Sequence, residues 1–197
     1  SDVYKRQYLT LTDWNGVSSV KNFVGLSNFA AVMRDAQFWK SLLLTFKYVI
    51  AVVVLVNVIA FLLAYILTRG IKGQNFFRAG FFTPNLIGGI VLGYVWQFVF
   101  NNVLIKMTNN ISLLSKTNTA MMAIIVVYIW QYAGYIMLIY VTGLTQVPKD
   151  VLEASQIDGA NAVTTLFKIK IPMIAATITI CTFLSLIHIS EPTRLLS

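Results

Sequence analysis

The sequence has little charge and few of the residues that build reactive sites. Only 11% of its residues are charged, whereas about 25% are charged in an average soluble domain. Hydrophobic residues make up 57% of the chain. A lone cysteine, Cys181, excludes an internal disulfide framework, and its position in an apolar run indicates a small buried or lipid-facing residue. This composition is typical of a membrane protein.

Several signatures of chemistry are also missing from the sequence. It holds no G-x-x-x-x-G-K-[ST] phosphate loop, no nucleophile paired with a base and no cluster of metal ligands. We therefore expect no catalysis, no cofactor and no metal. The net charge of +8 is scattered between apolar runs rather than gathered into a stripe, so we expect no nucleic-acid partner.

Four long apolar runs are present instead. They cover residues 48–68, 79–101, 117–148 (most apolar from 121 to 144) and 171–183. Runs of this kind are long enough to cross a bilayer, and signal peptides are shorter and occur once. The runs contain no aspartate or glutamate, which disfavours a proton-coupled carrier. The sequence predicts an all-α, polytopic transmembrane helical bundle with membrane lipid around it.

The loops between the runs predict an orientation. The short loop after the first run carries Arg69, Lys72 and Arg78 and no acid, which favours the cytoplasm. Residues 101–116 are then external, and residues 147–171 return to the cytoplasm.

The segment 148–172 has the pattern of two short helices around a turn. Pro148 suits a first helical turn, and Asp150 and Glu153 then lie near a helix N-terminus, where negative charge is favoured. Gly159 can turn the chain, and Asn161 is a candidate N-cap for a second helix. An ordinary connecting loop would show some of these features too.

The spacing in this segment is more specific than its helical pattern. Glu153-Ala154-Ser155 is followed by Gly159 and then by Ile169-Lys170-Ile171-Pro172. This resembles the cytoplasmic "EAA" loop of permease subunits of binding-protein-dependent ABC importers. The Asp158-Gly159-Ala160 and Val147-Pro148 strings resemble the carbohydrate-uptake branch, which includes maltose and glycerol-phosphate permeases, and so do the strings at residues 8–14 and 23–29.

The resemblance implies a permease subunit that imports a sugar or sugar-like solute. It implies these partners: a sibling permease subunit, an ABC ATPase dimer and an extracytoplasmic solute-binding protein. It also implies a multi-pass protein of the bacterial or archaeal plasma membrane. An ABC permease for another solute, such as a polyamine, a secondary carrier and a membrane protein without transport remain alternatives. The residues that the resemblance assigns to ATPase coupling are Glu153, Ala154, Ser155, Asp158, Gly159, Ala160, Ile169 and Pro172.

Polar and aromatic residues inside the runs are the candidates for a solute path. Amides in hydrocarbon are costly unless they bond to protein or line a wet cavity, and sugars are bound by polar groups together with aromatic faces. Interfacial anchoring and bonding between helices are alternatives. Asn57 is expected to bond a neighbouring helix, and Gly88, Gly89 and Gly93 fit close packing or a break after Pro84. The path candidates are Trp96, Gln97, Trp130, Gln131 and Tyr135.

Both ends of the chain resemble translated DNA-sequencing adapter. Back-translation of residues 1–7 resembles a transposon end, and that of 184–194 resembles its reverse complement followed by further adapter. We therefore expect residues 1–7 and 184–197 to be artefacts, which leaves a permease fragment over 8–183. His188 then supports no site.

The predicted artefact can be checked directly. Long-read sequencing of the source DNA should show a reading frame in which residues 1–7 and 184–197 are replaced by other codons. Both strings inside one uninterrupted natural frame would contradict the expectation.

Overall fold

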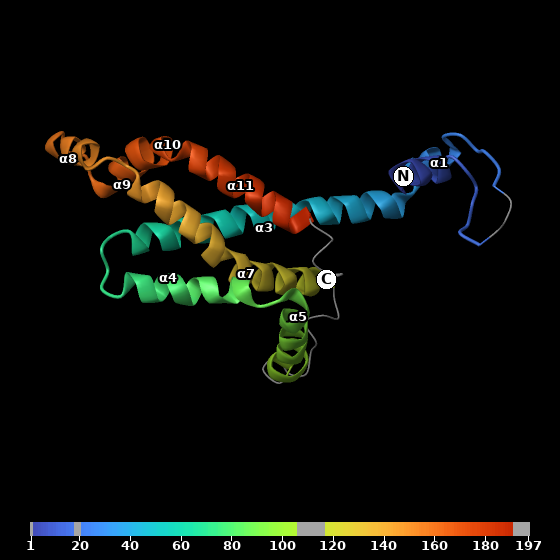
Figure 1. Cartoon of the computed structure of the whole chain (residues 1–197), viewed down its shortest axis with the longest axis horizontal. Coiled ribbons are helices and arrows are strands. Elements are labelled where there is room, and N and C mark those ends of the chain that lie inside the picture. The colour runs from blue at the N-terminus through green and yellow to red at the C-terminus, as the bar shows by residue number, and fades with distance from the viewer. Residues whose placement is uncertain (1, 18–20, 106–116, 191–197) are drawn as a thin grey trace. The chain divides into compact units, whose positions relative to one another are not determined.

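The computed structural model describes residues 2–17, 21–105 and 117–190 (Figure 1). Across these ranges the regular structure is helical, apart from an isolated antiparallel bridge between Thr12 and Phe23. The predicted all-α class is therefore confirmed. The chain divides into two compact units, Ser1–Lys47 and Tyr48–Ser197, and the boundary falls inside one long helix, α3 (Ala36–Leu67).

The first unit is a small assembly held by polar side chains. It contains α1 (Asp2–Thr10), α2 (Ser27–Arg34) and the start of α3. The Asn28 amide donates to the carbonyls of Thr10 and Thr12 at 2.9 and 2.8 Å, and so ties α2 to the end of α1. Asn22 donates through its side chain and its backbone to the Asp13 carboxylate, and these bonds lower the pKa of Asp13.

The second unit holds the remaining helices. They are the rest of α3, α4 (Gln74–Phe82), the 3₁₀ turn η1 (Thr83–Leu86), α5 (Gly89–Phe98), the π-helix η2 (Val99–Leu104), α7 (Thr117–Thr145), α8 (Lys149–Ile157), α9 (Ala162–Thr165), the π-helix η3 (Leu166–Lys170), α10 (Ile171–Met173) and α11 (Ala175–Ser190).

Two of the four predicted spans are single helices long and apolar enough to cross a membrane. They are α3 and α7, at Ala36–Leu67 and Thr117–Thr145. The predicted run 79–101 forms a bent pair rather than one straight helix, because Gln74–Leu86 and Gly89–Val103 meet at a bend of 95°. Pro84 lacks an N–H and its ring disfavours a continuous helix, and Gly88 is the extended N-cap that restarts it. The fourth run is also bent, by 70°, between Ala162–Met173 and Ala175–Ile189.

The core of this unit is a seam between α3, α7 and α11. On α3 the fully buried residues recur every fourth position, at Val52, Val56, Ala60 and Ala64, which places them along one face of the helix. They pack with α7 and α11 residues that include Ile136, Met137, Tyr140, Val141 and Cys181. The opposite side of α3 exposes large apolar residues, as expected of a helix beside lipid or another subunit.

A hydrogen-bonded pair crosses this seam. The Tyr140 hydroxyl of α7 donates to the Asn57 Oδ1 of α3 at 2.9 Å. The Asn57 Nδ2 donates to the Val53 carbonyl on its own helix and to the Ser185 hydroxyl of α11. The expectation that Asn57 bonds a neighbouring helix is confirmed. Since Ser185 falls in the predicted adapter-coded segment, the bond to Tyr140 is the one that the native chain is expected to keep.

Two glycines of α7 lie at close helix approaches. A Cβ on Gly134 would lie within 1.8 Å of the Phe81 carbonyl oxygen, and one on Gly143 would lie 2.6 Å from the Thr177 hydroxyl. Among the described residues, a Cβ added to Gly88 or Gly93 would meet nothing within 4 Å, so these two glycines make no close helix contact within that part of the chain. Gly88 serves the break after Pro84, which was the other interpretation.

The Gly134 approach predicts a sharp contrast between two glycine substitutions. Gly134→Ala should lower the midpoint of thermal unfolding, since overpacking costs about 1–3 kcal/mol and here the obstacle is backbone. Gly93→Ala, in the middle of α5 with open space around it, should leave the midpoint unchanged or raise it. The full-length protein in detergent is the sample for both. Equal midpoints for the two variants would contradict the close approach.

Candidate coupling loop and cavities

The segment 148–172 begins with helix α8 (Lys149–Ile157), whose N-terminus has no side-chain cap hydrogen bond. Pro148 has extended backbone angles and is the N-cap of α8, one position before the first turn in which the sequence placed it. Asp150 lies in the first turn of α8, where a negative charge stabilises the helix N-terminus. The side chain of Ser155 is buried and that of Leu152 packs against the core, so one side of α8 faces the bundle.

The turn after α8 is a Schellman motif. The N–H of Gly159 donates to the Gln156 carbonyl at 3.0 Å, and the N–H of Ala160 donates to the Ser155 carbonyl at 2.9 Å. Gly159 has a φ of 76°, in the left-handed region that side chains other than glycine and asparagine rarely adopt. The prediction that Gly159 turns the chain is therefore confirmed.

The second helix starts as predicted. Asn161 is the N-cap of α9, and its Oδ1 accepts the Thr164 N–H at 2.8 Å. The helix continues through η3 and α10 and bends at Ile174. Pro172 lies in α10, two residues before this bend.

The predicted coupling residues divide into an exposed group and an inward one. Ser155 is buried and its hydroxyl donates to the Leu152 carbonyl at 2.7 Å, so it stabilises the loop from within. Ala160 and Ile169 are half-buried. Within the described part of the chain the Glu153 carboxylate has no hydrogen-bond or ion-pair partner. The exposed group comprises Glu153, Ala154, Asp158, Gly159 and Pro172.

Three apolar side chains stand out from the same loop. Ile157 is 87% exposed, Val163 64% and Phe167 63%. They lie on the two short helices that the sequence predicts, but the sequence analysis did not assign them to the site. The signal was available, because an apolar helix face in a polar loop must be covered by something. We call Ile157, Val163 and Phe167 the apolar loop surface.

The loop and the basic segment 69–78 lie at the same end of the second unit. The ammonium of Lys170 lies over the Tyr65 ring, 5.3 Å from its centroid, and the Arg69 guanidinium is 4.8 Å from the same centroid. Figure 1 shows the α3–α4 connection and α8–α9 at this shared end. Two segments that the sequence placed independently on one side of the membrane are thus neighbours.

The structure does not gather the five path candidates into one place. Trp96 and Trp130 meet edge to face with centroids 5.6 Å apart, and the buried Trp96 Nε1 has no hydrogen-bond partner among the described residues. Gln97 lies instead in a cavity of about 370 Å³ with Tyr94, Phe98, Asn101 and Asn102. Tyr135 is half-buried and packs against the core.

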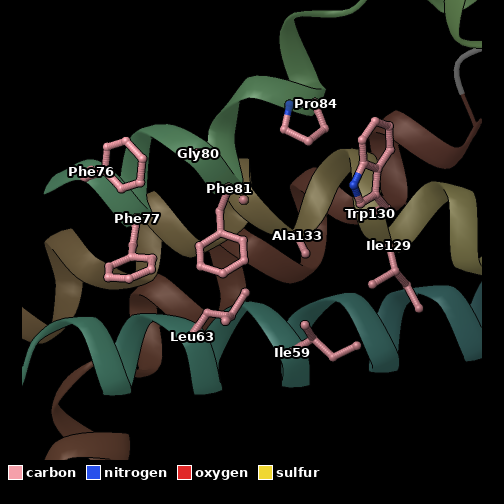
Figure 2. A pocket seen from close by; sticks show the side chains of 11 residues that line it. Ile59, Leu63, Phe76, Phe77, Gly80, Phe81, Pro84, Ile129, Trp130 and Ala133 are labelled. Carbon is pink, nitrogen blue, oxygen red and sulfur yellow. The ribbon is translucent and has the colours of Figure 1, made fainter. Parts of the chain in front are cut away.

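Trp130 also lines an apolar cavity of about 420 Å³ between three helices. Figure 2 shows Ile59 and Leu63 of α3 on one side, Phe76, Phe77 and Phe81 of α4 opposite, and Ile129, Trp130 and Ala133 of α7 behind. The walls are almost entirely hydrocarbon, so this cavity offers a sugar few hydrogen bonds.

Gln131 lines a more polar cavity of about 570 Å³, and this cavity lies at the break in the second span. Its other walls include Asn85, Tyr128 and Tyr132 and the unwound backbone of Ile87 and Gly88. Non-helical backbone at membrane depth is tolerated where it is buried in protein or lines a water-filled cavity, and broken helices often form transporter binding sites. The sequence analysis did not identify Asn85, Tyr128 or Tyr132. Asn85 was findable, since it follows Pro84 as a polar residue inside an apolar run.

Among the described residues, no group of three or more His, Cys, Asp and Glu side chains could hold a metal ion.

Comparison with known proteins identifies the family. The profile described as "Binding-protein-dependent transport system inner membrane component" matches residues 56–190, which is more than half of the chain. The chain belongs to this family of membrane transport permease subunits, which are not enzymes.

The curated relatives are permease proteins. The chain is 39% identical over 185 residues to the probable starch degradation products transport system permease protein AmyD of Thermoanaerobacterium thermosulfurigenes, covering 91% of this chain and 63% of that protein. It is 34% identical over 169 residues to the sn-glycerol-3-phosphate transport system permease protein UgpA of Agrobacterium fabrum, covering 82% and 57%. The chain therefore spans less than two thirds of the length of these relatives.

A solved structure has the same fold. A chain of a bacterial alginate ABC transporter, crystallised with an alginate pentasaccharide-bound periplasmic protein, superposes with a TM-score of 0.74 at 19% identity, covering 85% of this chain and 62% of that one. The chain therefore shares its overall helical fold with a chain of a transporter.

The shared end of the bundle makes a topological prediction. In full-length protein in intact cells, Lys72→Cys and Lys168→Cys should both resist an impermeant thiol reagent, whereas Asn109→Cys should be labelled. Position 109 lies outside the described residues. The native Cys181 is buried and should not react with the thiol reagent. Labelling at positions 72 and 168 but not at 109 would reverse the orientation.

Proposed function

We propose that the chain is part of the permease subunit of an ABC importer that moves a sugar or sugar-like solute into the cell. The observation that carries the proposal is the loop 148–172: a rigid, capped helix pair with exposed apolar side chains at the basic end of a membrane bundle. Family membership and the names of the relatives, which mention starch degradation products and sn-glycerol-3-phosphate, support it.

The loop would dock into a separate ATPase. The apolar loop surface supplies area to bury, and Glu153 supplies a carboxylate without a partner in the described chain. A basic group on the ATPase would complete the contact, since charged pairs at interfaces fix orientation as well as contributing affinity. Because the loop is capped at both short helices, closure of the ATPase dimer would move it as a unit.

The path for the solute would run beside the break in the second span. The cavity there combines the Gln131 and Asn85 amides with the rings of Tyr128 and Tyr132. Amide hydrogen bonds together with aromatic faces suit a sugar. The Trp96–Trp130 pair and Gln97 border other cavities, so their part in the path depends on the sibling subunit and on the rest of the protein.

The proposal includes the remaining partners and the location. The protein would be a multi-pass protein of the bacterial or archaeal plasma membrane, paired with a sibling permease whose helices complete the path. A solute-binding protein outside the membrane would deliver the solute. The alginate transporter of similar fold was crystallised with its periplasmic protein, which supports such a partner.

Charge reversal in the loop tests the docking directly. Glu153→Lys should insert normally but lose ATPase association by more than tenfold, since truncating one partner of a buried charge pair commonly costs about 2–5 kcal/mol and about 1.4 kcal/mol is a factor of ten. The control is Gln156→Lys, which introduces a lysine at an exposed position of the same helix without removing an acid. Co-purification with the ATPase and solute uptake are measured together. If Glu153→Lys associated with the ATPase as the wild type does, the docking role of the loop would be contradicted, and the loop would only connect two spans.

Removal of single amides tests the path. Gln131→Ala and Asn85→Ala should each reduce the apparent affinity for the solute by about twofold to tenfold, the value of one neutral hydrogen bond of about 0.5–1.5 kcal/mol, with ATPase association unchanged. Thr142→Ala is the control, because its exposed hydroxyl donates only to the Leu138 carbonyl on its own helix. Normal uptake in both variants would leave these amides as packing residues.

A further inference from the structure

Tyr65 of α3 lies where the membrane bundle meets the loop. Its ring is half-buried near the end of α3, and two cations face it from different elements. Arg69, one turn further along the chain, donates from Nη2 to the Tyr65 hydroxyl at 3.1 Å. Lys170, the last residue of η3, places its ammonium 5.3 Å from the ring centroid.

The Lys170 contact joins segments that are far apart in sequence. Lys170 stands at the end of the loop where the chain enters its last described helices, whereas Tyr65 belongs to the first long span. An ammonium over an aromatic face is attracted by the ring quadrupole, more strongly where water is excluded. In the second unit the described acids are Asp150, Glu153 and Asp158, all in α8 or at its C-cap, and none of them forms an ion pair with Lys170.

The ring itself is held in place from the bundle side. Tyr65 stacks on Phe61, with centroids 6.4 Å apart and planes 14° from parallel. Phe61 meets Tyr140 of α7 edge to face at 5.6 Å. Tyr140 in turn is fixed by its hydrogen bond to Asn57. The aromatic face offered to Lys170 is therefore part of the packed core rather than a free surface side chain.

We propose that Tyr65 is a positioning residue that anchors the C-terminal end of the 148–172 loop to the bundle through Lys170. The inference rests on the proposed function, in that the anchored loop is the one that docks the ATPase. The anchor lets a displacement of the loop reach α3 and α7 through rings already in contact. Without the anchor, the loop would move with the ATPase but would not transmit that movement to the membrane spans.

Two pairs of variants separate the anchor from general effects of charge and size. Lys170→Met removes the ammonium and keeps the stem, and Lys168→Met removes the same charge from an exposed position two residues earlier. Tyr65→Leu removes the ring, and Tyr65→Phe keeps the ring and loses only the hydroxyl. The full-length permease is assembled with its sibling and ATPase in proteoliposomes, and solute moved per ATP hydrolysed is measured.

The anchor predicts a specific pattern. Lys170→Met and Tyr65→Leu should each lower the transport-to-hydrolysis ratio by between about twofold and thirtyfold, the range that cation–π strength implies. The double variant should be no worse than the worse single one, because both remove the same contact. Tyr65→Phe and Lys168→Met should keep the wild-type ratio. Equal losses in Lys168→Met and Lys170→Met, or additive losses in the double variant, would overturn the anchor.

A readout of loop position tests the anchor independently of transport. Spin labels at Ile157→Cys on the loop and Val54→Cys on the exposed side of α3 give a distance distribution in the full-length permease. It should broaden in Lys170→Met and Tyr65→Leu and stay narrow in Lys168→Met. An unchanged distribution in both Lys170→Met and Tyr65→Leu would overturn the anchor even if docking through Glu153 is upheld. If Glu153→Lys leaves docking and uptake intact, the proposed function fails, and the distance measurement still decides on the anchor.

Discussion

Helix α7 is in contact with three neighbours at once, and the arrangement of the second unit follows from that constraint. It packs on α3 along the buried stripe that ends at Ala64, on α4 at Gly134 and on α11 at Gly143. Lipid tails are as apolar as the helix surfaces, so the hydrophobic effect does little to drive helices together. Close packing of small residues and hydrogen bonds between helices must stabilise the association instead. The Tyr140–Asn57 bond provides the second of these.

The same packing fixes where the loop and the polar cavity lie. The loop leaves α7 just after the end of the seam, so the capped helix pair starts from an anchored point. The cavity at Gln131 lies where the second span turns away from α7, because the chain at Ile87 and Gly88 no longer fills that space. The docking loop thus follows the end of α7 and the cavity lies beside its middle, so the helices around α7 hold both in place.

Local sequence signals predicted local structure well. The helix caps at Asn161 and Gly159 follow from rules that involve a few neighbouring residues, and the structure has both. The spans α3 and α7 follow from apolar length. The break near Gly88 did not follow from composition, because residues 79–101 remain apolar through it and only Pro84 hinted at a bend. The contacts of Gly134 and Tyr65 depend on which helices pack together. They could not be predicted, because the apolar periodicity of one helix does not specify which helix packs against it.

The solute-path candidates also show that neighbours in the sequence need not share surroundings in the fold. Pairing an indole with an amide at Trp96-Gln97 and Trp130-Gln131 suggested one shared lining. Adjacent residues on a helix point about 100° apart, so each indole and its amide had to face different surroundings. The indoles meet each other, and the amides lie in separate cavities.

The close approach at Gly134 also has a mechanical consequence. With the Phe81 carbonyl against the glycine, α7 cannot slide along α4 without a clash, but it can tilt about that point. The fulcrum divides α7 unequally: about 16 Å of helix extends to Thr145 at the loop end and about 25 Å to Thr117 at the other, at about 1.5 Å per residue. A tilt of α7 about Gly134 that is imposed at the loop end would therefore give a displacement about one and a half times as large at the far end.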